Sequence, residues 1–365
     1  MSEVELEDFV PEEAVIGGIF IGVGTALYML LAASVAGSSG AVKALVLLRT
    51  TDYGLIAFAC GLMLAGLVCV RIMPHLIFES PTPTHVHFLG GFAVGVGTSL
   101  GNGCTSGHGL CGISRLSMRS YIAVPVFLAT AIASATVKAG LPLERLTFVW
   151  PPTLTPPQNF RVAGYSALGL SVALMILLHG LHTDSSYRFC ETPPPTAKAA
   201  IGLWCGTCVG FGLSFGGMVK PSEVASALTI SKPVNLTLWV LFATALAVTF
   251  TLYRIAEHVG VRNARIDASR PAKIDRALIL GSMTFGAGWG AADFCPGPLL
   301  VSVAATPLAI APLSCLAGVT LGVHVADSFA APSAFSSPLV AAVERNEGEA
   351  KVQAAKQNAE GRSML

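Results

Sequence analysis

The stretch GNGCTSGHGLCGISRLS, Gly101–Ser117, determines how the rest of this chain is interpreted. Its first twelve residues hold five glycines, two cysteines, one histidine and two hydroxyl residues, and apolar segments flank it on both sides. Glycine is unfavourable inside a helix, and a helix end leaves backbone N–H groups without partners. We therefore expect a helix to break here and to leave backbone groups free to meet a ligand.

The composition of the whole chain indicates a membrane protein. The chain has 365 residues, of which 53% are apolar and 12% charged, and its mean hydropathy is +0.67. Soluble domains carry about 25% charged residues, so this chain has too few to cover a water-facing surface. The net charge of +1 gives no indication of a nucleic-acid partner. We predict a multi-pass protein of the lipid bilayer, in the plasma or inner membrane of the cell.

Most of the chain divides into apolar runs of about the 20 residues that a spanning helix needs. Seven runs are continuous: Ala14–Ala36, Tyr53–Met73, Tyr121–Leu141, Val162–Gly180, Ala199–Val219, Leu236–Tyr253 and Leu299–Val323. Glycines interrupt two others, Phe88–Cys111 and Ala277–Pro298. Backbone freed at membrane depth must be satisfied by protein or by a water-lined cavity. The fold class expected is therefore all-α, with multiple spanning helices and two broken or re-entrant helices.

An internal repeat is indicated by four Gly-x-Gly pairs, which begin at Gly22, Gly95, Gly210 and Gly286. The first and third pairs lie 188 residues apart, and the second and fourth 191 apart. A cysteine follows nine residues after the second pair and again nine after the fourth, as Cys104 and Cys295. We expect two pseudo-symmetric halves, residues 14–190 and 191–330, followed by a polar tail at 331–365.

The two halves are expected to be inverted. Basic residues follow the second Gly-x-Gly pair and precede the fourth (Arg115 and Arg119; Arg270, Lys273 and Arg276). If both basic clusters face the cytosol, the two halves have opposite orientations. Repeats of this kind in transporters place the binding site at their interface.

The residue types at the breaks favour a small, soft anion. A broken helix offers unpaired N–H groups and a positive helix end, which attract anions. Asn102, Thr105, Ser106 and His108 surround Cys104 with hydrogen-bond donors, and no lysine or arginine precedes either break within its stretch. A thiol is polarisable and suits an anion with an exposed sulfur. Asp293 at the second break is the one feature that opposes an anion there.

Other roles for the cysteines and histidines remain open at this point. The nine cysteines are irregularly spaced, and residues 1–13 carry six acids and no base, so neither a disulfide framework nor a cleavable signal peptide is expected. Cys104, His108 and Cys111 could be three ligands of a metal, although a fourth is not adjacent. Cys205 and Cys208 form a C-x-x-C, which in a redox enzyme is the active dithiol. Packing is the expected role for this pair and for Cys60, Cys69 and Cys315; we predict no cofactor and no enzyme activity.

The two broken stretches, GNGCTSGHGLCGISRLS and FGAGWGAADFCPGP (Phe285–Pro298), resemble the signatures of the YeeE/YedE (sulphur transport) family. A third segment, GFGLSFGGMVKPSEV (Gly210–Val224), is also similar to that family, and the resemblance covers about residues 14–325. It implies a compact helical membrane protein that passes thiosulfate along cysteine thiols. By position Cys104 and Cys295 are two of these thiols.

The rest of the site expected from the resemblance and the local chemistry is Asn102, Thr105, Ser106, Gly107, His108, Gly109, Cys111, Pro296 and Gly297. The family can carry a further cysteine near its first Gly-x-Gly helix, but residues 1–59 of this chain have none. A family segment is also altered, to ASVAGSSG at Ala33–Gly40. A soluble sulfur-carrier partner (TusA-like) would be a separate protein. The alternatives to thiosulfate uptake are an intramembrane thiol oxidoreductase, a carrier of sulfite, sulfate or another oxyanion, and a structural membrane protein.

Overall fold

The protein was analysed as a computed structural model that describes residues 11–47, 52–72, 82–141, 193–230, 235–259 and 274–329. The described residues up to His324 belong to one compact unit. Of the second unit, residues 325–365, the structure describes only 325–329, the C-terminal end of the last helix. The expected span Val162–Gly180 and the expected tail 331–365 lie outside the described residues. The division into halves at residues 190 and 191 also falls there and stays a prediction.

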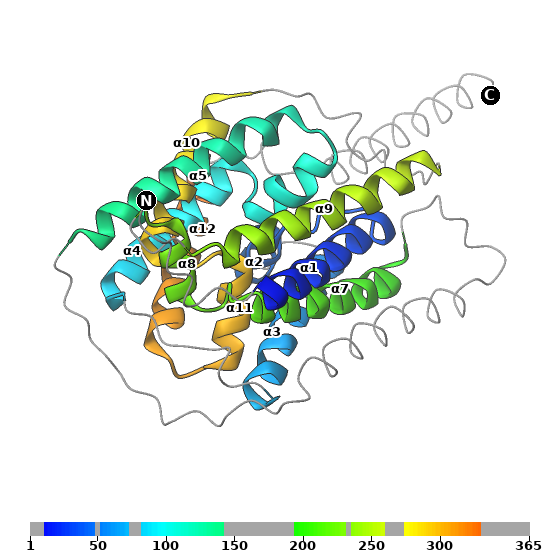
Figure 1. Cartoon of the computed structure of the whole chain (residues 1–365), viewed down its shortest axis with the longest axis horizontal. Coiled ribbons are helices and arrows are strands. Elements are labelled where there is room, and N and C mark those ends of the chain that lie inside the picture. The colour runs from blue at the N-terminus through cyan, green and yellow to red at the C-terminus, as the bar shows by residue number, and fades with distance from the viewer. Residues whose placement is uncertain are drawn as a thin grey trace, which may run out of the picture. The chain divides into compact units, whose positions relative to one another are not determined.

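Every described element is a helix (Figure 1), which confirms the all-α fold class for this part of the chain. In chain order the helices are α1 (Pro11–Leu31), α2 (Ser38–Leu47), α3 (Tyr53–Ile72), α4 (Thr84–Gly101), the π-helix η2 (Thr105–Gly112), α5 (Met118–Ala139), α7 (Pro195–Phe215), α8 (Pro221–Leu228), α9 (Thr237–His258), α10 (Arg276–Ala292), α11 (Pro296–Ala305) and α12 (Ile310–Phe329).

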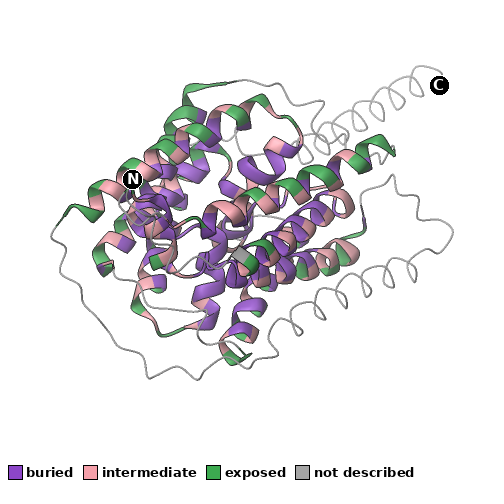
Figure 2. Ribbon diagram, viewed as in Figure 1, coloured by how far each residue is buried: buried purple, intermediate pink, exposed green. Residues whose placement is uncertain are grey.

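Six of the described helices, α1, α3, α5, α7, α9 and α12, are long and apolar enough to cross a membrane. Large apolar side chains such as Leu67, Val137 and Phe250 are exposed on them, where lipid would cover them. Figure 2 shows buried residues gathered around the short helices α2 and α11, while exposed residues follow the outer faces of α5 and α9. The short helices therefore occupy the interior of the compact unit, between the long ones.

Both predicted helix breaks are present. α4 ends at Gly101 and η2 begins at Thr105; α10 ends at Ala292 and α11 begins at Pro296. The residue after each long helix, Asn102 or Asp293, has a left-handed backbone with φ of 54° or 60°. This conformation ends a helix, and Asn and Asp tolerate it better than other non-glycine residues. Gly217, the matching residue seven positions after Gly210, is also left-handed, with φ of 73°.

One expectation for the other apolar runs was wrong. The run Leu299–Val323 is not one span: α11 ends at Ala305 and α12 begins at Ile310, because Pro307 between them lacks the N–H that a continuing helix needs. The run Ala14–Ala36 does supply a helix long enough to span a membrane, α1, although this helix ends at Leu31 and α2 begins seven residues later. The short helices α2 and α8 were not predicted, since each falls within or beside a longer apolar or mixed segment.

The described helices follow one another as four triplets, each made of a long first helix, a short helix and a long third helix. These triplets are α1–α2–α3, α4–η2–α5, α7–α8–α9 and α10–α11–α12. The four Gly-x-Gly pairs lie in the four first helices, α1, α4, α7 and α10. In Figure 1, α1 lies beside α7 and α9, which it contacts.

The Gly-x-Gly pairs let the first helices approach their neighbours closely. A Cβ atom added at Gly97 would lie 2.2 Å from the backbone nitrogen of Phe285, so a larger residue does not fit between α4 and α10. Within α4, Gly95 faces α12 and Gly97 faces α10. Within α10, Gly286 faces α5 and Gly288 faces α4. The second and fourth triplets therefore exchange matching contacts.

The first and third triplets repeat this arrangement. Gly22 faces α9 and Gly24 faces α7, while Gly210 faces α3 and Gly212 faces α1. In all four pairs the first glycine meets the third helix of the partner triplet, and the second glycine meets its first helix. The same small-residue pattern thus serves the same packing role four times.

The partnered first helices run antiparallel. Gly90, near the start of α4, lies against Ala292 at the end of α10, while Gly101 at the end of α4 lies against Gly281. The same antiparallel order holds for α1 and α7, in which Gly17 contacts Gly212 and Gly24 contacts the backbone of Cys205. Two of the short helices, α2 and α11, contact each other, and η2 contacts α2.

Candidate functional site

A small cavity lies where three short helices begin. It is lined by Ser38 at the start of α2, by Cys104, Thr105 and Ser106 at the start of η2, and by the segment Cys295–Pro298 at the start of α11. About 40 Å³ of it is open to the centres of water-sized molecules, whereas one water needs ~10–15 Å³. The cavity therefore has room for a few small polar atoms.

The remaining wall of the cavity is apolar. It comes from α1, η2, α7, α9 and the turn after α7, through Ile21, Leu110, Val209, Leu213, Met218, Leu238, Leu241, Phe242 and Ala245. None of the described residues that line the cavity is charged. Three helix N-termini thus meet an apolar wall, and the N-terminus of a helix carries partial positive charge. Such a place favours an anion over a cation.

The two broken helices touch each other at this cavity. The Thr105 hydroxyl oxygen and the Cys295 sulfur are 3.4 Å apart and share a hydrogen bond, although 190 positions separate them in the sequence. Cys104 and Cys295 are both buried, with 1% and 2% of their surfaces exposed. The fold therefore brings together the two cysteines that the repeat pattern singles out.

Cys104 also contacts the start of α2. The backbone N–H of Ser39 donates to the Cys104 sulfur at 3.4 Å, and the backbone N–H of Ser38 donates to the Ser106 hydroxyl at 3.1 Å. The Ser106 hydroxyl in turn donates to the Ser38 hydroxyl at 3.3 Å and lies 3.3 Å from the Cys104 sulfur. Two backbone N–H groups at the start of α2 thus donate to side chains at the start of η2, one to the Cys104 sulfur and one to the Ser106 hydroxyl.

Local sequence explains why both cysteines sit at helix starts. Cys104 and Cys295 have extended backbones and each immediately precedes a short helix. Pro296 then occupies the first helical position of α11, where its missing N–H costs nothing. The cysteine side chain is therefore placed at the N-terminal end of the helix that follows it.

Six of the residues expected in the site line the cavity: Cys104, Thr105, Ser106, Cys295, Pro296 and Gly297. Asn102 does not; it is exposed, and its left-handed backbone ends α4. His108 is buried beneath the break instead, where its two ring nitrogens lie 3.1 Å from the Ser120 hydroxyl and 3.1 Å from the Gly101 carbonyl. His108 thus joins the end of α4 to the start of α5.

Cys111, Gly107 and Gly109 also lie away from the cavity lining. The Cys111 thiol donates to the Ala36 carbonyl at 3.9 Å. A Cβ atom at Gly109 would meet the ring of Phe242 at 2.5 Å, and one at Gly107 would meet no atom within 4 Å. Within η2, then, glycine permits close packing at one position and is not sterically required at the other.

Sequence reasoning missed the contributions of Ser38, Ser39 and Met218. The altered segment ASVAGSSG contains both serines, and a serine pair after glycine is a signal for a helix start. That signal predicts α2 but does not place it beside Cys104, because the contact joins residues 65 positions apart. Met218 lies in the turn after α7, within the third segment that resembles the family.

The alternative roles of the cysteines find no geometric support in the described part of the chain. Its eight cysteines are free thiols, and Cys205 and Cys208 lie on α7 outside the cavity lining. Cys208 packs with Cys69, Phe20 and Phe215 in a separate apolar cluster. No group of three or more His, Cys, Asp and Glu residues among the described positions could hold a metal ion.

Comparisons with known proteins match two separate parts of the chain, each of which contains one of the two breaks. The family model described as "Sulphur transport" matches residues 10–133, and one described as "Family of unknown function (DUF6691)" matches residues 198–331. A protein of Xylella fastidiosa (strain Temecula1 / ATCC 700964) named "Probable transporter" is 39% identical over 125 residues, which are 33% of this chain and 90% of that protein.

A second protein named "Probable transporter", from Xylella fastidiosa (strain 9a5c), is 34% identical over 113 residues, which are 30% of this chain and 76% of that protein. Cys104 falls within the first family match and Cys295 within the second. With six helices able to span a membrane, these similarities indicate a multi-pass membrane transporter rather than an enzyme.

Proposed function

The chain belongs to the sulphur transport family, and from this premise we propose that it takes up thiosulfate, or a closely related sulfur anion, through the cavity at the two helix breaks. The observation that carries the proposal is the meeting of Cys104 and Cys295 in one uncharged cavity at three helix N-termini. The family supplies the class of substrate, and the residues of the cavity supply the reason for a sulfur-containing anion.

The cavity offers two kinds of donor to such an anion. Helix N–H groups and the hydroxyls of Ser38 and Ser106 suit the oxygens of the anion, and the thiols suit its terminal sulfur. No cavity lysine or arginine among the described residues would hold a dianion tightly, which suits passage rather than storage. The backbone N–H groups of Ser38 and Ser39, which now donate to Ser106 and Cys104, become available to the anion when those side chains rotate.

We also propose that the breaks are re-entrant and that the chain consists of two inverted halves. The four glycine pairs make matching contacts, and the partnered first helices run antiparallel. Both are expected of two homologous halves related by a twofold axis in the membrane plane. The cavity between α2, η2 and α11 then lies at the interface of the halves.

A competition assay tests the substrate. Thiosulfate and sulfate share charge and approximate size and differ in one terminal atom, so thiols that contact the sulfur should separate them by ~10–200-fold, as a single altered contact does. Uptake of labelled thiosulfate by cells that express the chain is measured against excess sulfate, sulfite and unlabelled thiosulfate. Equal inhibition by sulfate and thiosulfate would replace thiosulfate by a general oxyanion as the substrate.

The oxidoreductase alternative makes a different prediction for the same cells. A dithiol enzyme would pass through a mixed disulfide with a soluble thiol protein and would not accumulate label. Accumulated label that stays intact thiosulfate inside the cell supports transport. Trapping of a mixed disulfide on Cys205 or Cys208 would contradict it.

A further inference from the structure

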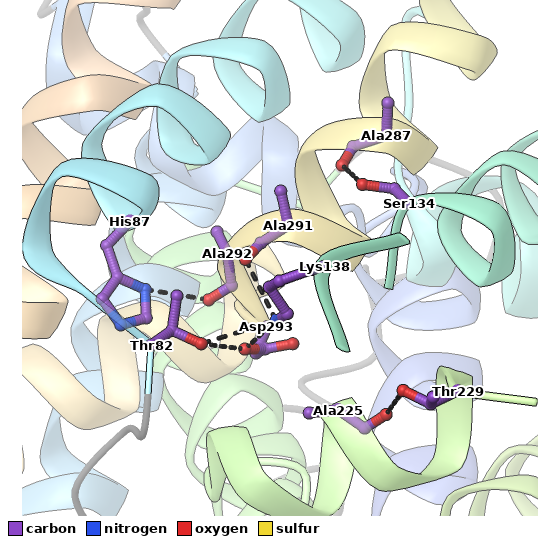
Figure 3. A network of polar contacts seen from close by, with 10 residues as sticks. All are labelled: Thr82, His87, Ser134, Lys138, Ala225, Thr229, Ala287, Ala291, Ala292 and Asp293. Atoms are coloured by element: carbon purple, nitrogen blue, oxygen red, sulfur yellow. Dashed lines mark hydrogen bonds and ion pairs between the residues drawn. The ribbon is translucent and has the colours of Figure 1, made fainter. Parts of the chain in front are cut away.

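A buried carboxylate lies at the second helix break, beside the cavity but not lining it. Asp293 ends α10, has no exposed surface, and precedes Cys295 by two residues. Its Oδ2 atom accepts hydrogen bonds from the Thr82 hydroxyl at 2.8 Å and from the Lys138 ammonium at 2.5 Å. Figure 3 shows Thr82, two residues before the start of α4, and Lys138 of α5 approaching this carboxylate.

The ammonium of Lys138 is the positive charge that pairs with the Asp293 carboxylate. It donates to the Ala291 carbonyl at 3.1 Å and lies 3.4 Å from the Thr82 hydroxyl, in addition to its ion pair with Asp293. The end of a helix attracts positive charge, and α10 ends here. Lys138 belongs to the last turn of α5, and its side chain is 12% exposed. Part of its side chain thus reaches the surface of the helix bundle.

Two polar atoms at this break lack partners among the described residues. One is Oδ1 of Asp293 and the other is Nε2 of His87, and both are buried. The other ring nitrogen of His87, Nδ1, lies 3.0 Å from the Ala292 carbonyl. Buried polar groups are nearly always satisfied, and a carboxylate oxygen left bare inside a protein is costly. The break is thus built to receive something that can bond to a carboxylate oxygen.

The geometry of the other breaks shows that this charge is not needed to end a helix. Asn102 and Gly217 occupy the matching positions, seven residues after the first glycine of their pairs, with the same left-handed backbone and no charge. Only Asp293 among these three brings an acid. The free-energy cost of burying the Asp293 carboxylate must therefore be offset by a role other than ending the helix.

We propose that Asp293 is a proton-binding site and that Lys138 couples its occupancy to the passage of the anion. This inference rests on the proposed function. An anion at Cys295 competes with Asp293 for the ammonium of Lys138. The carboxylate left without its partner in a buried site then takes a proton from the water at that side of the membrane. When the anion departs, Lys138 returns and the proton leaves on the other side, so that one proton accompanies each anion.

The groups that face Asp293 are consistent with this exchange. Lys138 of α5 forms an ion pair with Asp293, His87 of α4 bonds the carbonyl of the preceding residue, Ala292, and Cys315 of α12 is buried. The acid of α8, Glu223, is instead bound by the amide of Asn235. Lys138 is therefore the cation whose departure most directly exposes Asp293 to protonation.

The test uses the purified full chain in liposomes with the membrane voltage clamped at zero by potassium and valinomycin. With the outside acidic, wild-type protein is expected to accumulate labelled thiosulfate about tenfold for each pH unit and each proton carried. A protonophore should abolish the accumulation. The same vesicles, loaded with a pH dye, should acidify when thiosulfate is added outside in the absence of an initial pH gradient.

The decisive variant is Asp293→Asn, because asparagine keeps the shape and already holds the same backbone at Asn102. It should retain downhill thiosulfate entry but show neither accumulation under the pH gradient nor dye acidification. The matched control is Asp52→Asn, which breaks the other described aspartate–lysine pair, Asp52 with Lys198 at 3.0 Å, and should leave accumulation unchanged. The double variant Asp293→Asn/Lys138→Met removes both charges and serves if the single variant fails to fold.

The outcomes separate this inference from the function on which it rests. Wild-type thiosulfate entry without accumulation or acidification would overturn the proton site and leave the transport function standing. Accumulation and dye acidification by the Asp293→Asn variant at the level of the wild type would also overturn it. If no thiosulfate enters under any condition, both the proposed function and this inference are contradicted.

Discussion

At the scale of single residues, position separates Cys104 and Cys295 from the other described cysteines. Burial does not separate them, because Cys69, Cys205 and Cys315 are equally enclosed. Cys104 and Cys295 each stand at the start of a short helix, where both thiols line the same small cavity. A thiol in the middle of a long helix has no such neighbours, since the backbone there is already paired.

Replacing Cys104 or Cys295 by alanine should lower thiosulfate uptake by ~10–200-fold, the usual effect of removing one specific contact. Alanine removes the sulfur but little volume, so the protein should remain folded. Serine at either position keeps a hydrogen-bond donor but loses the polarisable sulfur atom. The serine variants should therefore take up more thiosulfate than the alanine variants, but should discriminate less between thiosulfate and sulfate than the wild type does. Labelled uptake and competition in the same cells measure both effects.

The control for this prediction is the double variant Cys205→Ala/Cys208→Ala, which changes two buried thiols outside the cavity. Its uptake should stay near that of the wild type, with expression checked on the membrane fraction. Wild-type uptake by both Cys104→Ala and Cys295→Ala would show that thiols do not carry the anion.

Sequence alone predicted six of the seventeen residues that line the cavity, all of them at the two breaks. Cys104–Ser106 and Cys295–Gly297 could be predicted because glycine and proline fix a break locally. His108 and Cys111 were expected beside them, but a turn of η2 directs His108 toward Gly101 and Cys111 toward Ala36. Ser38 could not be predicted, because tertiary packing of a distant helix brings it to the cavity.

At the scale of elements, the site depends on close contact between helices that carry glycine. α4 and α10 approach each other so closely at Gly97 and Gly281 that backbone meets backbone. These two helices lead into the two breaks, at opposite ends of their antiparallel contact. A change in helix spacing should therefore act on both stability and transport.

Gly97→Ala should destabilise the folded protein by about 1–3 kcal/mol, the usual cost of overpacking a well-packed interior. The added Cβ would lie 2.2 Å from a backbone atom of α10, which cannot move aside as a side chain can. Unfolding of the purified protein in detergent, followed by circular dichroism against denaturant, measures the change.

Gly40→Ala in α2 is the matched control, because the nearest atom to an added Cβ there is 3.7 Å away on the side chain of Leu55. This variant should be as stable as the wild type, or more stable by up to about 1 kcal/mol, since alanine favours a helix. Equal stability of the two variants would contradict the close-packing role of the glycine pairs.

Element boundaries were predictable where length or a breaker residue decides them. Long apolar runs identified α3, α5, α7 and α9 because a bilayer requires about 20 residues. Helices of eight to ten residues, such as α2, α8 and α11, lie below that length and carry no periodic signal that distinguishes them from the ends of spans. Pro307 does mark the boundary between α11 and α12, but apolar content on both sides concealed it.

At the scale of the whole compact unit, the triplets pack in pairs, the first with the third and the second with the fourth. α1 crosses α7 and α4 crosses α10 in opposite directions, so matched helices begin at opposite ends of the bundle. Arg119 at the start of α5 lies 3.8 Å from Asp275 at the start of α10, so these two starts share one end. These contacts fix which ends lie together, although the sequence offered only a repeat offset and the position of basic residues.

The inverted arrangement predicts the side of the membrane from which each helix start is accessible. His85, at the start of α4, and Ile274, just before α10, are exposed and belong to matched helices. Because α4 and α10 are antiparallel, His85→Cys and Ile274→Cys should react with a membrane-impermeant thiol reagent from opposite sides. Met118→Cys, at the start of α5, should react from the same side as Ile274→Cys.

The measurement uses a chain in which Cys60, the exposed thiol of the described part, and Cys190 are replaced by alanine. Labelling is compared in right-side-out and inside-out vesicles, and denatured samples show that each introduced thiol can react. Labelling of His85→Cys and Ile274→Cys from one side would mean that α4 and α10 do not both cross the membrane in the antiparallel pair. In that case the two halves would not be inverted, and the twofold axis in the membrane plane proposed for them would be wrong.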